Sequence, residues 1–456
     1  MRIREDASAY RLYFTEFDDQ GWSFVTPQGN GARAHEQLAI LESELSAAID
    51  QPAPLSVVVF VPGWKHTARS DDGNVMDFRL LLRALQRVEE SGCGRRIVGV
   101  YVGWRGAGTV IPPLEGVTFW SRKNAASRVG QGDVRLLFAK LRNLQERANE
   151  PYAKRIREAV EKRSSAPLEA FSSDALDPCG KRMRLTIAGH SMGGLIVHTA
   201  LAQSLVKDIV DRRAFEIRFP SPSRGDRIPA PREGDMVILI NPAVEAARFA
   251  PLYRAATEQR FPEYRSPILI SLTSNADKAV GMAFPIGRFF STLFHSYPDG
   301  NHDDQSNADM VGLGMDKNRI SHWLAPAENV DASRLAVCEG WVGDASSDEA
   351  MRNNVEISRA NAAGLVERLR KAKWDGDQAQ IFPLVFCSKQ PLTLKLNRDA
   401  REVSANTPVW NVQTVSAVMA GHSDLGNPVL REVLRQLYVE GDERVLQIAP
   451  PLRPLE

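Results

Sequence analysis

The sequence has few cysteines, and none of them is placed for a metal site. The four cysteines, at positions 93, 179, 338 and 387, lie far apart and form no CxxC pair and no cluster with histidine. Zinc sites and disulfide frameworks both depend on closer spacing. We therefore expect reduced thiols without a structural role, and no bound metal.

A charge excess of one sign and long hydrophobic runs are also absent. Lys and Arg number 57 against 56 Asp and Glu, so charge gives no reason to expect nucleic acid or an anionic membrane as the main partner. No apolar run reaches the roughly 18 residues of a transmembrane helix, and the opening MRIREDASAYRLYFTEFDDQGW does not resemble a Sec signal. These absences favour a cytoplasmic protein that acts on a small molecule. Export without a signal and contact with a membrane surface remain open.

Short apolar runs alternate with helical patterns along most of the chain. The runs are rich in β-branched residues and bounded by Gly, Pro or Asn, as buried strands are. They are SVVVFV (56–61), RIVGVYVGW (96–104), RLTIAGH (184–190), DMVILI (235–240), SPILISLTS (266–274) and PVWNVQT (408–414). This alternation predicts an α/β fold with a mostly parallel sheet and helices on both faces. YRLYFTEFD (10–18) and GWSFV (21–25) predict an antiparallel hairpin at the sheet's edge.

Two stretches depart from the alternation within what we expect to be a single domain, residues 1–456. Residues 206–233 are rich in Pro and in charges of both signs, which predicts a surface insertion. Residues 280–405 form a larger insertion, or a cap-like elaboration, before the final core strand. The segment AVGMAFPIGRFFSTLF (279–294), which leads into it, suits the wall of an acyl pocket or an ordinary core helix equally well.

The tetrapeptide AGHS occurs twice, at 188–191 and at 420–423, in different flanking sequences. The first copy lies in the pattern G-x-S-x-G, after a predicted strand and before the helical GLIVHTALAQSL. A sharp turn from strand to helix strains the central Ser191 and requires glycine on either side. Ser191 would then stand at a helix N-terminus, where the amide of Met192 and the helix dipole stabilise a developing oxyanion. The pattern therefore predicts a nucleophile.

The GHSMGG turn resembles the nucleophile elbow of the α/β-hydrolase superfamily of serine esterases and lipases. The resemblance covers about residues 55–205, 235–280 and 405–440. It implies the α/β-hydrolase fold and a triad in the chain order serine, acid, histidine. It says little about the substrate.

The resemblance also implies the other two members of the triad. His422, in the second AGHS, follows the last predicted strand and is expected to act as the general base. Asp277 follows the strand ending at Ser274 and is the favoured acid. Glu245, after the preceding strand, is the alternative acid. His190 is expected to pack rather than to react.

The loop PGWKH (62–66) resembles the loop that supplies the second oxyanion amide in such enzymes. The resemblance assigns this amide to Trp64, beside that of Met192. Pro62 stands where histidine is common in the family, and proline removes one N–H from the loop.

The expected function is hydrolysis of a carboxylic ester, from a small molecule or a lipid, through an acyl-enzyme on Ser191, with no cofactor. The same residues suit a thioesterase, an amidase or an acyltransferase, because fold and triad do not select the acceptor. A binding protein without catalysis on this fold is the alternative from another class.

Overall fold

The computed structural model describes residues 3–23, 36–90, 93–104, 115–163, 178–218, 236–258, 267–283, 296–297, 302–326, 384–385, 391–397, 403 and 407–440. Its strands form one sheet in the order β1-β2-β4-β3-β5-β6-β7-β11-β8-β10-β9. They are β1 (Arg4–Asp6), β2 (Arg11–Phe17), β3 (Leu55–Val61), β4 (Arg96–Trp104), β5 (Met183–His190), β6 (Met236–Ile240), β7 (Leu269–Ser274), β8 (His322–Pro326), β9 (Leu384–Val385), β10 (Pro391–Leu396) and β11 (Val409–Thr414).

The sheet is parallel from β2 through to β8 in this spatial order, and antiparallel only at its two edges. Each of the six apolar runs named above is one of its strands. The predicted α/β class with a mostly parallel sheet is therefore confirmed. Because parallel strands all point the same way, the loops that follow β3, β5, β6, β7 and β11 meet at one end of the sheet.

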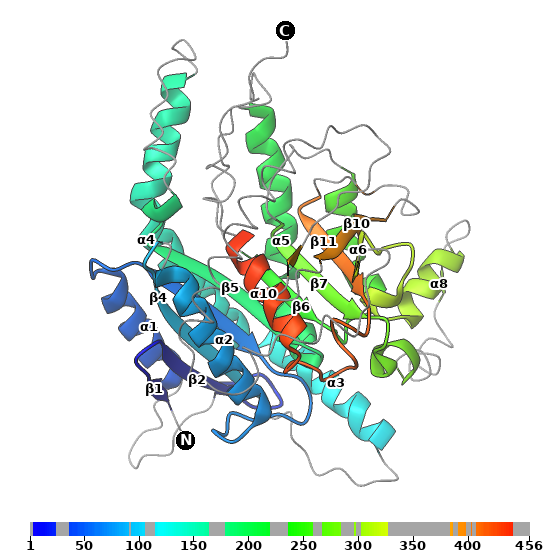
Figure 1. Cartoon of the computed structure of the whole chain (residues 1–456). Helices are drawn as coiled ribbons and strands as arrows, with labels where there is room; N and C mark the ends of the chain where they lie inside the picture. The colour runs from blue at the N-terminus through cyan, green and yellow to red at the C-terminus, as the bar shows by residue number, and fades with distance from the viewer. Residues whose placement is uncertain are drawn as a thin grey trace.

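Helices cover both faces of the sheet (Figure 1). Along β3 the side chains alternate, since Val57, Val59 and Val61 join one apolar cluster while Val58 and Phe60 join the other. The first cluster includes residues of α1, α3, α4, α5 and α6, and the second includes residues of α2 and α10. The helices are α1 (Glu36–Ile49), α2 (Gly73–Glu90), α3 (Glu115–Gln131), α4 (Val134–Arg163), α5 (Met192–Arg218), α6 (Ala246–Thr257), α8 (His302–Met310) and α10 (Pro428–Glu440), with short turns η4 (Pro178–Gly180), η5 (Ala279–Ala283) and η6 (Leu313–Met315).

The N-terminal hairpin is present, but its strands differ from the predicted ones. β2 pairs antiparallel with β1, which precedes it, and on its other side it pairs parallel with β4. Of the predicted second strand, Ser23 forms an isolated antiparallel bridge with Phe17, and residues 24–25 lie outside the described residues. The prediction missed β1, which pairs with the start of β2 on the edge away from β4, whereas Ser23 meets β2 at its last residue.

The two expected insertions have different outcomes. Residues 206–218 continue helix α5, so this part of the predicted insertion 206–233 is regular structure, and 219–235 lie outside the described residues. In the described part of 280–405, β8, β10 and β9 extend the sheet beyond β11. Residues 284–294, the greater part of the predicted pocket wall or core helix, lie outside the described residues.

The expectation of reduced thiols was wrong for Cys93 and Cys179, which form a disulfide with Cα atoms 5.0 Å apart. Cys93 precedes β4 and Cys179, in η4, precedes β5; these strands flank β3 on its two sides. The parallel sheet thus brings together residues 86 positions apart, a proximity that cysteine spacing does not reveal. Cys338 and Cys387 lie outside the described residues.

Among the helices that the structure describes, none combines the length and the hydropathy needed to cross a membrane.

Candidate active site

Ser191 occupies a strained turn between β5 and α5. Its φ of 55° lies in the left-handed region, which a residue other than glycine seldom adopts. The flanking glycines are required by contact: a Cβ on Gly193 would lie 2.1 Å from the carbonyl oxygen of Val61, and one on Gly189 would lie 2.6 Å from that of Gly193. The turn thus holds Ser191 above the end of the sheet, in the geometry that the G-x-S-x-G pattern predicts.

Ser191, His422 and Asp277 form one hydrogen-bonded chain. Ser191 Oγ lies 2.6 Å from His422 Nε2, and His422 Nδ1 lies 2.7 Å from Asp277 Oδ2. A carboxylate can only accept, so Nδ1 carries the proton and Nε2 is free to accept from the serine hydroxyl. Asp277 and Ser191 are buried, whereas the His422 side chain is 25% exposed. The structure therefore brings together the three residues expected from the sequence, with the histidine open to solvent.

Asp277 is fixed by the loop that follows β7. Its Oδ1 accepts from the amides of Ala279 and Val280, at 2.9 and 3.0 Å, where η5 begins. Its own amide donates to the Ser274 carbonyl at 3.1 Å. With one oxygen held by the backbone, the other is aimed at His422.

The His422 loop is held through its backbone. His190 Nε2 lies 2.8 Å from the His422 carbonyl oxygen, to which it must donate, and Asn241 Nδ2 donates to the same oxygen at 3.1 Å. Burial, and then the proximity of His422, lower the pKa of His190 to about 3, so this imidazole stays neutral near pH 7. His190 thus packs, as expected, and also anchors the loop. Asn241 was missed by the sequence reasoning; its only signal is an amide directly after the buried strand MVILI.

The expected oxyanion loop lies against the serine turn. A Cβ on Gly63 would lie 2.9 Å from Ser191 Cβ, so the loop after β3 approaches the nucleophile closely. Trp104 Nε1 donates to the Pro62 carbonyl at 2.8 Å, and Lys65 takes a φ of 71°. Met192 is the first residue of α5, a position whose amide has no acceptor within its own helix. Both amides expected to bind an oxyanion therefore belong to segments beside Ser191.

An aromatic cluster borders this loop. The Trp64 ring packs edge-on against Phe119 of α3, with ring centroids 5.8 Å apart, and Phe119 contacts Trp120 in the same manner at 5.3 Å. All three side chains are partly exposed. They offer an apolar surface next to polar donors, the combination typical of small-molecule sites.

Glu245, the alternative acid, forms ion pairs with two cations. Its Oε1 contacts Lys123 Nζ at 2.5 Å and its Oε2 contacts Arg248 Nε at 3.0 Å. Burial opposes ionisation, but the two cations outweigh it and lower the pKa of Glu245. The carboxylate that contacts His422 is therefore that of Asp277.

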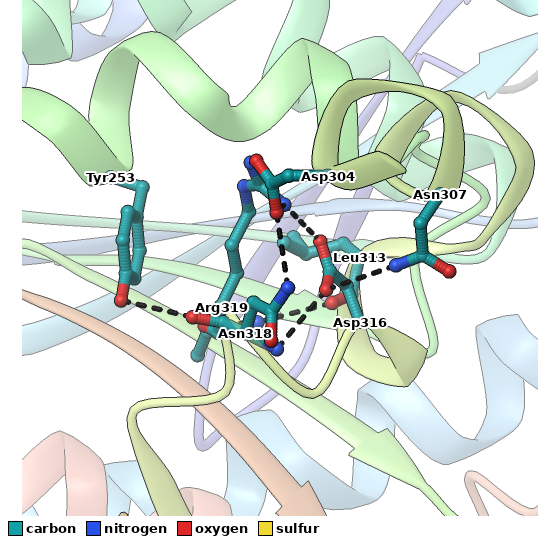
Figure 2. Close-up of polar contacts among 8 residues, drawn as sticks. Tyr253, Asp304, Asn307, Leu313, Asp316, Asn318 and Arg319 are labelled. Carbon is teal, nitrogen blue, oxygen red and sulfur yellow. Dashed lines mark hydrogen bonds and ion pairs between the residues drawn. The ribbon is translucent and has the colours of Figure 1, made fainter. Parts of the chain in front are cut away.

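Part of the 280–405 insertion supports the acid loop. A Cβ on Gly314, in η6, would lie 2.0 Å from Thr273 Oγ1, so η6 lies directly on the end of β7. Figure 2 shows the network that fixes η6 to α8: Arg319 bonds Asp304 at 2.6 Å and also pairs with the buried Asp316. Asp304 is thus a helical residue whose carboxylate neutralises Arg319.

No protein-family model, no curated protein and no solved structure matches this chain.

Proposed function

We propose that the protein is a serine hydrolase with the α/β-hydrolase fold that cleaves a carboxylic ester. The observation that carries the proposal is the chain from Ser191 Oγ through the His422 imidazole to Asp277, with links of 2.6 and 2.7 Å. It stands on a serine whose strained backbone the surrounding glycines permit. Strain of this kind is kept where a function needs it.

The proposed reaction has two halves. His422 Nε2 takes the Ser191 proton as Oγ bonds to the ester carbonyl carbon, and the amides of Met192 and Trp64 stabilise the oxyanion. The intermediate collapses as the carbon–oxygen bond to the alcohol breaks, and His422 returns the proton to the leaving alcohol. Water, deprotonated by His422, then attacks the acyl carbon. The bond between this carbon and Oγ breaks as His422 returns the proton to Ser191 Oγ, which frees the acid and restores the enzyme. Asp277 holds the Nδ1 tautomer and stabilises the imidazolium throughout.

The aromatic cluster beside the oxyanion loop favours an ester with an apolar acyl or alcohol group as the substrate. The Trp64, Phe119 and Trp120 side chains border the oxyanion loop and are partly exposed. Burial of an acyl chain or an aromatic alcohol against them contributes about 25 cal/mol per Å² of apolar surface.

The first experiment is to label the purified protein with a fluorophosphonate and map the adduct by mass spectrometry. We expect an adduct on Ser191 that is lost in His422→Ala, and a fall of about a millionfold in kcat for Ser191→Ala on any ester turned over. A screen of esters and matching thioesters of increasing acyl length then defines the substrate. A folded protein that neither reacts nor hydrolyses would contradict the proposal and favour a binding protein.

A further inference from the structure

Asn241 ends strand β6 in an unusual conformation. Its φ is 42°, in the left-handed region that asparagine tolerates better than most residues. Its side chain is fully buried. Its backbone N–H donates to the Leu272 carbonyl at 2.8 Å, which continues the pairing of β6 with β7. In the sheet, β6 lies between β5, which leads to Ser191, and β7, which leads to Asp277. Asn241 thus stands between the nucleophile and the acid.

The Asn241 side chain joins two loops of the site. Its Oδ1 accepts from the Ser274 amide at 2.9 Å, at the end of β7. Its Nδ2 donates to the carbonyls of Gly421 and His422, at 3.3 and 3.1 Å. One rigid amide therefore spans from the strand that carries the acid to the loop that carries the base.

Further bonds tighten the same connection. Ser274, whose backbone amide donates to Asn241, makes two further bonds. Its hydroxyl donates to the Met419 carbonyl at 2.6 Å, and its carbonyl accepts from the Asp277 amide at 3.1 Å. The His422 carbonyl also accepts from His190, the residue before the nucleophile. The histidine loop is thus bonded to the acid loop at Met419 and to the residue before the nucleophile at His422.

We propose that Asn241 is a positioning residue that sets the His422 imidazole between Ser191 and Asp277 through hydrogen bonds to the backbone of the histidine loop. This inference rests on the proposed hydrolase function. Asn241 touches no reacting atom in this mechanism; it acts by fixing the backbone from which the imidazole projects. Because the imidazole has to meet partners at 2.6 and 2.7 Å on its two sides, a small shift of the loop breaks one contact or the other.

The chemistry of the amide explains why asparagine suits this position. The two carbonyls need a donor and the Ser274 amide needs an acceptor, and an amide side chain of this length offers both at every pH. In Asn241→Asp the shape and the acceptor are kept, but the ionised carboxylate has no donor and faces two carbonyl oxygens. The loop is then pushed away from Asn241.

The chain offers a matched control at the other end of β5. Asn149 also bonds a backbone on both sides, since its Nδ2 donates to the Met183 carbonyl at 2.7 Å and its Oδ1 accepts from the Met183 amide at 3.0 Å. Met183 begins β5 and Ser191 follows its end. Asn149→Asp makes the same chemical change to the same kind of contact, away from the proposed site.

The test compares the full-length wild type, Asn241→Asp and Asn149→Asp by fluorophosphonate labelling rate, ester kinetics against pH, and thermal unfolding. We expect both variants to lose stability, and only Asn241→Asp to lose about a hundredfold in labelling rate and kcat with little change in KM. Equal kinetics in the two variants would overturn the inference.

Asn241→Gly serves if Asn241→Asp does not fold, because glycine accepts the positive φ without strain and the same loss of kcat is expected. Amide hydrogen exchange of residues 415–427 in this variant tests whether Asn241 holds the histidine loop, and it requires no measurement of activity. Faster exchange than in the wild type supports this role, and unchanged exchange contradicts it. If the wild type itself resists the probe, the hydrolase proposal fails, and the exchange result still decides whether Asn241 holds the loop.

Discussion

At the scale of single residues, the glycine of AGHS is closely packed in the first copy, as Gly189, and open in the second, as Gly421. A Cβ on Gly189 would lie 2.6 Å from the Gly193 carbonyl oxygen, whereas nothing lies within 4 Å of a Cβ on Gly421. Gly189→Ala should therefore destabilise the fold by about 1–3 kcal/mol, because the elbow has no room for a methyl group. Gly421→Ala should be neutral. Chemical denaturation of both variants checks this, and equal stabilities would contradict the close packing of the elbow.

The two candidate acids are also separable at this scale. Asp277→Asn should lower kcat by about 10⁴-fold, because the amide favours the wrong tautomer of His422. Glu245→Gln should leave the rate nearly unchanged but cost about 3–5 kcal/mol of stability, because the buried Lys123 loses the carboxylate it contacts at 2.5 Å. Steady-state kinetics beside urea unfolding of both variants distinguishes the two roles, and the reverse pattern would make Glu245 the acid.

At the scale of elements, the Cys93–Cys179 disulfide joins the segments that lead into β4 and β5. It closes a loop of 86 residues, for which chain entropy predicts about 4.6 kcal/mol of stabilisation. Reduction, or the double variant Cys93→Ser and Cys179→Ser, should lower the Tm by several degrees. Unchanged unfolding after complete reduction would contradict this.

Peptide mapping without a reductant, on protein purified from the organism that makes it, tests whether the Cys93–Cys179 disulfide forms in the cell. Disulfides persist mainly in oxidising compartments, so an intact bond there would count against the expected cytoplasmic location. Free thiols at both positions would agree with that location.

At the scale of the whole molecule, buried neutral histidines make the protein sensitive to acid. Burial lowers the pKa of His190 and His322 to about 3 and that of His198 to about 4. The unfolded chain binds protons at these positions below about pH 6.5 and the folded protein does not, so stability falls as the pH drops from about 6.5 toward 4. Each histidine contributes up to about 1.4 kcal/mol per pH unit.

The variant His198→Met tests this source of acid sensitivity away from the proposed site. We expect its free energy of unfolding to fall less steeply between pH 6.5 and 4.5 than that of the wild type. The difference in slope should be up to about 1.4 kcal/mol per pH unit, the value for one proton. An identical slope would show that His198 is not the neutral, buried group described here.

The sequence by itself determined the α/β class and the glycine-framed turn that carries Ser191. Both follow from local patterns: apolar runs that suit buried strands, and a serine between two glycines after such a run. Asp277 and His422 came from the resemblance to the α/β-hydrolases, with Glu245 as the alternative acid. Because parallel strands end together, a residue after each strand is already assigned to one end of the sheet.

Only the tertiary structure decided which residues connect across that end. The choice of Asp277 over Glu245, the Cys93–Cys179 bond and the role of Asn241 all depend on contacts between residues far apart in the chain. Spacing along the chain carries no information about such contacts, because the packing of the whole sheet sets them.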